Sequence, residues 1–132
     1  MSAVTALCQE YFDAVGRGDT ATLTTLVTDD FVHELMGSTV FAGKRDIREV
    51  SELVVDLRRS TVAGVEFTFE SQTEQDDRFA AIVHGRSELL EGGRFDNLYV
   101  IFVEVRDGKI ARMRELTDTK YTDATRGSAV SA

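Results

Sequence analysis

Apolar residues in the first half of the chain recur at helical spacing. One stripe runs through residues 4–15, and Gly16-Arg17-Gly18 supplies a stop, so a helix is predicted over this stretch. Asp19 is a typical N-cap for a short second helix whose apolar residues are Leu23, Leu26 and Val27. A short strand is expected from Phe31 to Met36. A third helix is expected from about Lys44 to Arg59, with an apolar side formed by Ile47, Val50, Leu53, Val54 and Leu57.

The second half changes to the period of β-strands. Val65, Phe67 and Phe69 alternate with polar residues, as in a half-buried strand. Turn signals divide the remainder into expected strands at about 78–91, 94–106 and 109–119. Strands joined by hairpins predict an antiparallel meander, which must twist, and the preceding helices must cover one of its faces. The predicted fold class is α+β, a cone-shaped curved antiparallel sheet covered by three N-terminal helices.

Residues 1–121 are expected to form a single domain, and the small, polar stretch 122–132 is expected to be a loose tail. The 132 residues suffice to bury a core without disulfides or metals. Cys8 is the single cysteine and therefore cannot form an intramolecular disulfide. The sequence has neither the pattern of a signal peptide nor the roughly 20 apolar residues of a membrane helix, so a cytoplasmic protein is expected.

Charge narrows the range of partners. The chain has 15 Lys and Arg against 23 Asp and Glu, a formal net charge of −8. Nucleic-acid binding and polybasic membrane contacts draw on clustered positive charge, so neither partner is expected. The two histidines, His33 and His84, lack the spacing of a metal motif, and no Gly-rich phosphate loop or dinucleotide fingerprint is present. No metal and no cofactor is therefore expected.

One carboxylate is a candidate for chemistry. Alternation places Asn97, Tyr99, Ile101 and Val103 on one face of their strand, and Met113, Glu115 and Thr117 on one face of the next. Glu115 has apolar and neutral neighbours on its face, and a carboxylate aimed into a dry cone suits a general acid or base. Alternatively, Glu115 lies at a strand end and pairs with Arg112 or Arg114.

A second polar group lies earlier in the meander. His84, Arg86 and Glu88 share one face of their expected strand. If that face points inward, these residues contribute to a pocket. If Phe79, Ala81 and Val83 point inward instead, the charged stripe faces solvent or a partner subunit. The sequence alone leaves both orientations open.

The order of elements resembles the nuclear transport factor 2-like (NTF2-like) superfamily, which includes ketosteroid isomerase, limonene epoxide hydrolase and SnoaL-like polyketide cyclases. The resemblance implies a cystatin-like α+β barrel, an internal apolar pocket and a homodimer formed through the convex side of the sheet. The motifs that carry it are Tyr11-Phe12 with Gly18-Asp19, Asp29-Asp30-Phe31, Gly43-Lys44-Arg45-Asp46-Ile47, Asn97-Leu98-Tyr99, Asp107-Gly108-Lys109-Ile110 and Arg114-Glu115-Leu116-Thr117-Asp118-Thr119.

The epoxide-hydrolase pattern suggests one set of roles. Arg86 and Glu88 stand two apart, like the arginine and first carboxylate of that family, and Glu115 falls at the position of its second carboxylate. One acid would protonate an epoxide while the other carboxylate activates water. Both carboxylates are Glu here rather than Asp. The family's water-holding residues fall at His33 and Leu35, and Leu35 cannot form a hydrogen bond.

The ketosteroid isomerase pattern suggests another set. Tyr11 matches the oxyanion-hole tyrosine of that family, and its hydroxyl could donate to a developing enolate. The family's base and its acid would fall near Leu35 and Ile101, neither of which transfers a proton, so the standard steroid isomerase mechanism is not expected. Tyr11 is alternatively a core aromatic. His33 is either a general acid–base group at the pocket mouth or a surface histidine.

These observations predict a pocket for a small hydrophobic molecule that is steroid-, terpenoid- or polyketide-like. The leading mechanism is cofactor-free proton transfer of isomerase, cyclase or epoxide-hydrolase type. In it Glu115 is the acid or base, Arg86 and Glu88 are candidate partners, and Tyr11 or Asn97 orients a substrate oxygen. The alternative is a non-catalytic binding or dimerisation module. The residues expected to contact the substrate are Asn97, Tyr99, Ile101, Met113, Phe12 and Leu35.

Overall fold

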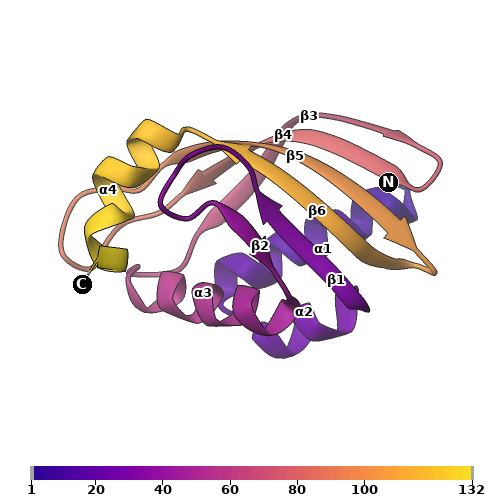
Figure 1. The fold of residues 1–132 in the computed structure, drawn as a ribbon, viewed down its shortest axis with the longest axis horizontal. Helices are drawn as coiled ribbons and strands as arrows, with labels where there is room; N and C mark the ends of the chain where they lie inside the picture. Colours follow the sequence, from indigo (N-terminus) through magenta and orange to yellow (C-terminus); the bar gives the residue numbers. More distant parts are fainter. Residues whose placement is uncertain (1, 132) are drawn as a thin grey trace.

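The computed structural model describes residues 2–131 as a curved six-stranded sheet with helices on one side (Figure 1). The strand order is β2-β1-β6-β5-β4-β3. The elements in chain order are α1 (Ala3–Arg17), α2 (Thr20–Leu26), β1 (Val27–Leu35), β2 (Gly43–Arg45), α3 (Ile47–Arg59), β3 (Glu66–Gln75), β4 (Arg78–Arg86), β5 (Asn97–Arg106), β6 (Lys109–Thr117) and α4 (Thr119–Ser131).

The predicted α+β cone is confirmed. Strands β3 to β6 form an antiparallel meander, and the helices α1, α2 and α3 lie together on one side of it (Figure 1). The prediction of an antiparallel sheet misses one feature, because β1 runs parallel to β6 and antiparallel to β2. The sheet also stays open, since β2 and β3 are its two edges. Among the helices of residues 2–131, none has the length and apolar character needed to cross a membrane.

Local sequence signals fix the helix ends. The Asp19 side chain accepts a hydrogen bond from the Thr22 amide at 3.1 Å and so caps α2 as predicted. Gly18 ends α1 with a positive φ of 73°, a conformation that glycine adopts without strain. Helix α3 begins at Ile47, three residues later than predicted, because Asp46 forms a capping box with Glu49 and residues 43–45 pair as β2.

Two strand boundaries differ from the prediction. Strand β1 starts at Val27, which was expected to lie in α2, and ends at Leu35. The expected strands 78–91 and 94–106 shorten to β4 and β5, since residues 87–96 form a loop with an isolated bridge between Glu88 and Arg94. The turns at Asp76 and at Asp107-Gly108 have positive φ angles, which match the right-handed twist of the hairpins they join.

The core decides which face of β4 points inward. Phe79, Ala81 and Val83 are at most 5% exposed, whereas Arg86 is exposed. In register, Phe79 lies opposite Val103, which in turn lies opposite Met113 on β6. These side chains pack with Tyr11 and other residues of α1. The odd-numbered residues of β4 therefore face the helices, and the charged stripe faces away from them.

Helix α4 occupies the segment that was predicted to be a loose tail. Asp118 accepts a hydrogen bond from the Tyr121 amide at 3.1 Å at the start of the helix. The Tyr121 ring stacks on Phe95 with a centroid separation of 5.6 Å and an interplanar angle of 10°. Thr122 is buried, and Asp123 accepts hydrogen bonds from the Thr39 hydroxyl and the Val40 amide. Phe95 and Thr39, which contact the helix, lie far away in the sequence, so the composition of the segment does not reveal these contacts.

Helix α1 approaches the start of β3 so closely that residue 16 must be glycine. A Cβ at Gly16 would lie 2.0 Å from the carbonyl oxygen of Val65, whose amide donates to the Gly16 carbonyl at 3.0 Å. Helix propensity alone would make Gly16→Ala stabilising by about 1 kcal/mol. We expect instead that Gly16→Ala lowers the free energy of unfolding by about 1–3 kcal/mol in urea denaturation, because the backbone must move.

The control is Glu10→Ala at an exposed position of the same helix, which should change the free energy of unfolding by less than about 0.5 kcal/mol. An unchanged or raised stability of the Gly16→Ala protein would contradict the close approach.

Candidate functional site

Two adjoining hollows lie between the curved sheet and the helices. The outer hollow has a volume of about 240 Å³ and reaches from β1 and α3 to β5, β6 and α4. The inner hollow has a volume of about 150 Å³ and lies between α1, α3 and the sheet. Both are lined by His33, Leu53, Leu57, Tyr99 and Glu115. We call the two hollows together the apolar pocket.

Glu115 and His33 meet where the two hollows join. The parallel pairing of β1 with β6 puts Leu35 opposite Glu115 and His33 opposite Met113. The distance between His33 Nε2 and Glu115 Oε1 is 3.5 Å, and each side chain is 14% exposed. Such a contact is long for a hydrogen bond, and catalytic contacts commonly shorten when a substrate binds. Among the described residues, His33 Nδ1 is buried without a hydrogen-bond partner, and Nε2 is the ring nitrogen that faces Glu115.

Two tyrosines line the same pocket. Tyr11 is 2% exposed and lines the inner hollow, and Tyr99 lines both hollows. Burial raises the pKa of each tyrosine well above its ordinary value, and the negative charge of Glu115 raises it further. Both hydroxyls therefore stay protonated over the physiological range. Each can donate a hydrogen bond to a ligand oxygen.

The other residues that were predicted to contact the substrate divide into two groups. Phe12 lines the inner hollow and Leu35 the outer one. Ile101 and Met113, which are at most 1% exposed, pack in the core and line neither hollow. Alternation predicts the face on which they lie. It does not predict that Phe79 and the α1 side chains cover that part of the face.

Asn97 is part of the wall, but its amide is engaged within the protein. Its Nδ2 atom donates to the hydroxyls of Thr117 and Thr122, both at 2.8 Å, and its Oδ1 atom accepts from the Leu98 amide at 2.9 Å. The side chain is 6% exposed. Asn97 thus joins α4 to the end of the sheet, and its donors are not free to orient a substrate.

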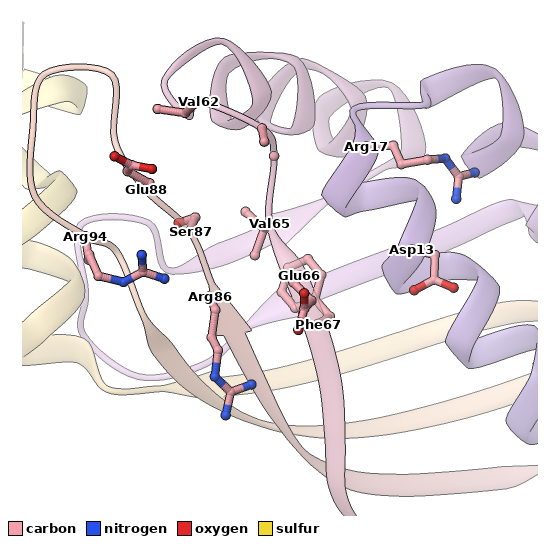
Figure 2. Close-up of a pocket in the computed structure, with 12 residues that line it drawn as sticks. Asp13, Arg17, Val62, Val65, Glu66, Phe67, Arg86, Ser87, Glu88 and Arg94 are labelled. Atoms are coloured by element: carbon pink, nitrogen blue, oxygen red, sulfur yellow. The ribbon is translucent and has the colours of Figure 1, made fainter.

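Arg86 and Glu88 lie in a different place from Glu115. They line an open groove of about 580 Å³ at the ends of β3 and β4, opposite Asp13 and Arg17 of α1 (Figure 2). Arg86 Nη1 donates to the Thr68 hydroxyl at 2.9 Å on the face of β4 that points away from the core. The structure does not bring the three residues of the epoxide-hydrolase pattern together, because strand alternation turns Arg86 away from the pocket.

The charges of this groove are largely matched. Arg94 pairs with Asp96 at 2.9 Å and Arg17 with Asp19 at 3.2 Å, and Glu66 and Glu88 also line the groove. A mixed, solvated lining of this kind does not resemble a site for an apolar molecule. The smaller apolar pocket is therefore the better candidate site, although the groove has the larger volume.

Metal binding and nucleophilic catalysis by Cys8 are two further chemistries that the geometry of the described residues does not support. Within residues 2–131, no three His, Cys, Asp or Glu side chains come together in a way that could hold a metal ion. Cys8 is fully buried, and burial, with the charge of Glu74, raises the pKa of its thiol to about 12. The thiol is therefore protonated at neutral pH and is a poor nucleophile.

Sequence reasoning missed a substantial part of the pocket wall. Leu53 and Leu57 were predicted on the apolar side of α3. Leu53 is 38% exposed and Leu57 is partly exposed, which is the sign that this side faces a hollow. Phe95 lies in a loop where periodicity carries no information. Phe41, Arg45, Asp56 and Arg126 also line the outer hollow.

The fold and its pocket define an NTF2-like α+β domain. The chain belongs to the SnoaL-like domain family, whose model matches residues 8–113. None of the curated proteins compared with the sequence matches it.

Solved structures share the fold at low sequence identity. PrhC from Penicillium brasilianum NBRC 6234 is 11% identical with a TM-score of 0.84, and the match covers 98% of this chain and 89% of PrhC. IdmH from Streptomyces antibioticus, described as a candidate polyketide cyclase, is 20% identical with a TM-score of 0.76, covering 94% of this chain and 98% of IdmH. An NTF2-like protein from Burkholderia xenovorans LB400 is 20% identical with a TM-score of 0.70, and the match covers 92% of this chain and 94% of that protein. At this identity the likeness shows the fold alone.

The hydrogen bonds of Asn97 predict how α4 is held. We expect Asn97→Ala to lower the free energy of unfolding by about 1–3 kcal/mol, because the hydroxyls of half-buried Thr117 and buried Thr122 lose their donor. We also expect faster trypsin cleavage after Lys120 and Arg126, measured by mass spectrometry. Glu91→Ala, at an exposed loop position, is the control and should change neither quantity. An unaltered cleavage rate in Asn97→Ala would show that other contacts suffice to hold α4.

Proposed function

We propose that this protein is a cofactor-free enzyme that transfers a proton on a small, largely apolar substrate bound in the apolar pocket. The observation that carries the proposal is the contact between Glu115 and His33 at 3.5 Å inside an apolar cavity that two neutral tyrosines also line. A titratable pair with hydroxyl donors beside it is the arrangement that general acid–base catalysis uses.

In the proposed mechanism, Glu115 removes a proton from a carbon next to a substrate carbonyl. Negative charge then develops on the carbonyl oxygen, and the hydroxyl of Tyr11 or Tyr99 stabilises it by donating a hydrogen bond. Return of the proton from Glu115 to a different carbon completes an isomerisation. Attack of the carbanion on a second carbonyl of the same molecule completes a cyclisation, in which the proton passes to the new alkoxide. His33 keeps the Glu115 carboxylate in place.

The epoxide-hydrolase version has less support. That mechanism needs a second acid near the first carboxylate, and Arg86 and Glu88 line the separate groove. Asp56 is the other carboxylate of the pocket wall, but it is exposed and would be solvated. The family model and the candidate cyclase IdmH agree with the isomerase or cyclase class. Among the described residues, Glu115 is the carboxylate that lines both hollows, and its side chain is 14% exposed, which supports a reaction by proton transfer.

The test starts with a ligand for the pocket. Thermal unfolding is recorded against a panel of lipophilic ketones, epoxides and polyketide-like phenols. A compound at 100 times its dissociation constant should add about 2.7 kcal/mol of stability, a shift of several degrees for a domain of this size. For a ketone that binds, NMR then measures the exchange of deuterium from D₂O into the carbon next to the carbonyl.

We expect Glu115→Gln to lower this exchange rate by about 10²–10⁴-fold, because the variant keeps the shape of the side chain but cannot accept the proton. The dissociation constant of the ketone should change by less than about threefold. Glu34→Gln is the matched control, since Glu34 is the neighbour of His33 on β1 but lies against Arg112 and Arg114 outside the pocket. Full exchange activity in Glu115→Gln would rule out the proposed role.

A second proposal concerns assembly, and it rests on the face of the sheet that points away from the helices. Strands β5 and β6 present large apolar side chains there, with exposures of 45% for Leu98, 50% for Val100, 40% for Phe102 and 45% for Leu116. Val100 and Leu116 lie directly opposite each other in register. We propose that two copies of the chain cover this face as a homodimer, in which the pocket of each copy remains open at the far side.

Substitution on this face tests the homodimer. We expect Val100→Lys to convert a dimer to a monomer in sedimentation-velocity experiments, because a lysine would bury an unpaired charge at the interface. Leu90→Lys is the control, since Leu90 is even more exposed, at 65%, but lies in the loop after β4. A wild-type protein that sediments as a monomer at high concentration would disprove the proposal.

A further inference from the structure

Two arginines line the outer hollow but not the inner one. Arg45 is the last residue of β2, and its cross-strand partner is His33 of β1. Directly opposed residues of neighbouring strands share a face, so Arg45 points to the same side as His33. Arg126 comes from α4, and its guanidinium carbon lies 5.7 Å from the centre of the Phe95 ring. Arg45, Arg126 and Phe95 all line the outer hollow.

Neither guanidinium is matched by a carboxylate among the residues whose side chains the structure describes. Within the part of the chain whose side chains the structure describes, ion pairs within 4 Å occupy Arg17, Arg94 and Arg106 but include neither Arg45 nor Arg126. Asp56, which also lines the outer hollow, is exposed and makes no such pair among the described residues. Two half-buried positive charges thus face a cavity in a chain of net charge −8.

Arg126 lies on the pocket side of α4. It lines the outer hollow, and its guanidinium carbon lies over the ring of Phe95, which lines the same hollow. This cation–π contact holds the guanidinium at the wall of the hollow.

The charges are consequently divided within the pocket. Arg45 and Arg126 line the outer hollow alone, whereas Glu115 lies where the two hollows join, and apolar side chains such as Leu57 line both hollows. An anionic group on a ligand would be repelled by Glu115 and attracted by the two guanidinium groups. A guanidinium matches a carboxylate in shape and can donate two parallel hydrogen bonds to it.

We propose that the substrate of this pocket is an apolar molecule with a carboxylate at one end, which Arg45 and Arg126 bind while the carbon skeleton extends inward to Glu115. The inference rests on the proposed function of the pocket and adds the class of substrate. It also assigns to the two arginines the role of fixing the direction in which the substrate enters. Because Arg126 belongs to α4, this helix supplies one half of the carboxylate site.

The test compares two probes that differ only in charge, 2-naphthylacetate and 2-naphthylacetamide, by titration calorimetry on the full chain. We expect wild-type protein to bind the acid about tenfold more tightly than the amide. Arg45→Gln and Arg126→Gln should each weaken binding of the acid about tenfold and of the amide by less than about twofold. Unchanged amide binding shows that each variant is folded.

Arg48→Gln is the matched control, because Arg48 lies on α3 near Arg45 but is exposed and pairs with Glu52 at 3.1 Å. It should change the binding of both probes by less than about twofold. The inference is overturned if the wild-type protein binds acid and amide equally, or if the variants weaken both probes by the same factor. Equal binding of the two probes would leave the pocket intact as a site, whereas binding of neither would contradict the pocket proposal as well.

Discussion

The parallel pairing of β1 with β6 is the constraint on which the candidate site depends. It joins the helical first half of the chain to the meander of the second half, and its register sets Leu35 opposite Glu115. Side chains alternate along a strand, so a slip of one residue would turn His33 out of the pocket and separate it from Glu115. The same pairing places β2 at the edge, and Arg45 with it. Distant residues therefore meet at one place because of a single strand register.

Burial of Glu115 shapes the electrostatics of that place. A carboxylate in an apolar cavity is unfavourable unless a partner offsets the loss of water, and His33 is the partner within 4 Å. The negative charge of Glu115 also acts on the two tyrosines. Burial is the larger reason that their hydroxyls stay neutral, and the charge of Glu115 is the second. The groups suited to proton transfer thus lie together in a pocket that many apolar side chains also line, and a few polar groups among apolar ones are usual in a small-molecule site.

The sequence predicts the parts of this arrangement that depend on local periodicity. Alternation along 109–119 was enough to put Glu115 and Met113 on one face, and helical spacing was enough to put Leu53 and Leu57 on the apolar side of α3. The orientation of Arg86 could not be decided in the same way, because both faces of β4 carry apolar residues near its centre, Ala81 and Val83 on one and Ala80 and Ile82 on the other. Phe79 and Val103 decide it through a contact between strands.

Helix α4 marks the limit of such reasoning, because its position depends on contacts that are remote in sequence. Phe95 receives the Tyr121 ring on α4, and both Thr122 and Phe95 are at the same time part of the pocket wall. By thermodynamic linkage, a ligand that touches Thr122 or Arg126 binds more tightly to the docked helix than to a detached one, and it must stabilise the docked helix by the same free energy. If such a ligand binds, the stability of α4 and the affinity of the pocket are linked, and Asn97, Phe95 and Arg126 are residues that belong to both the pocket wall and the contacts of α4.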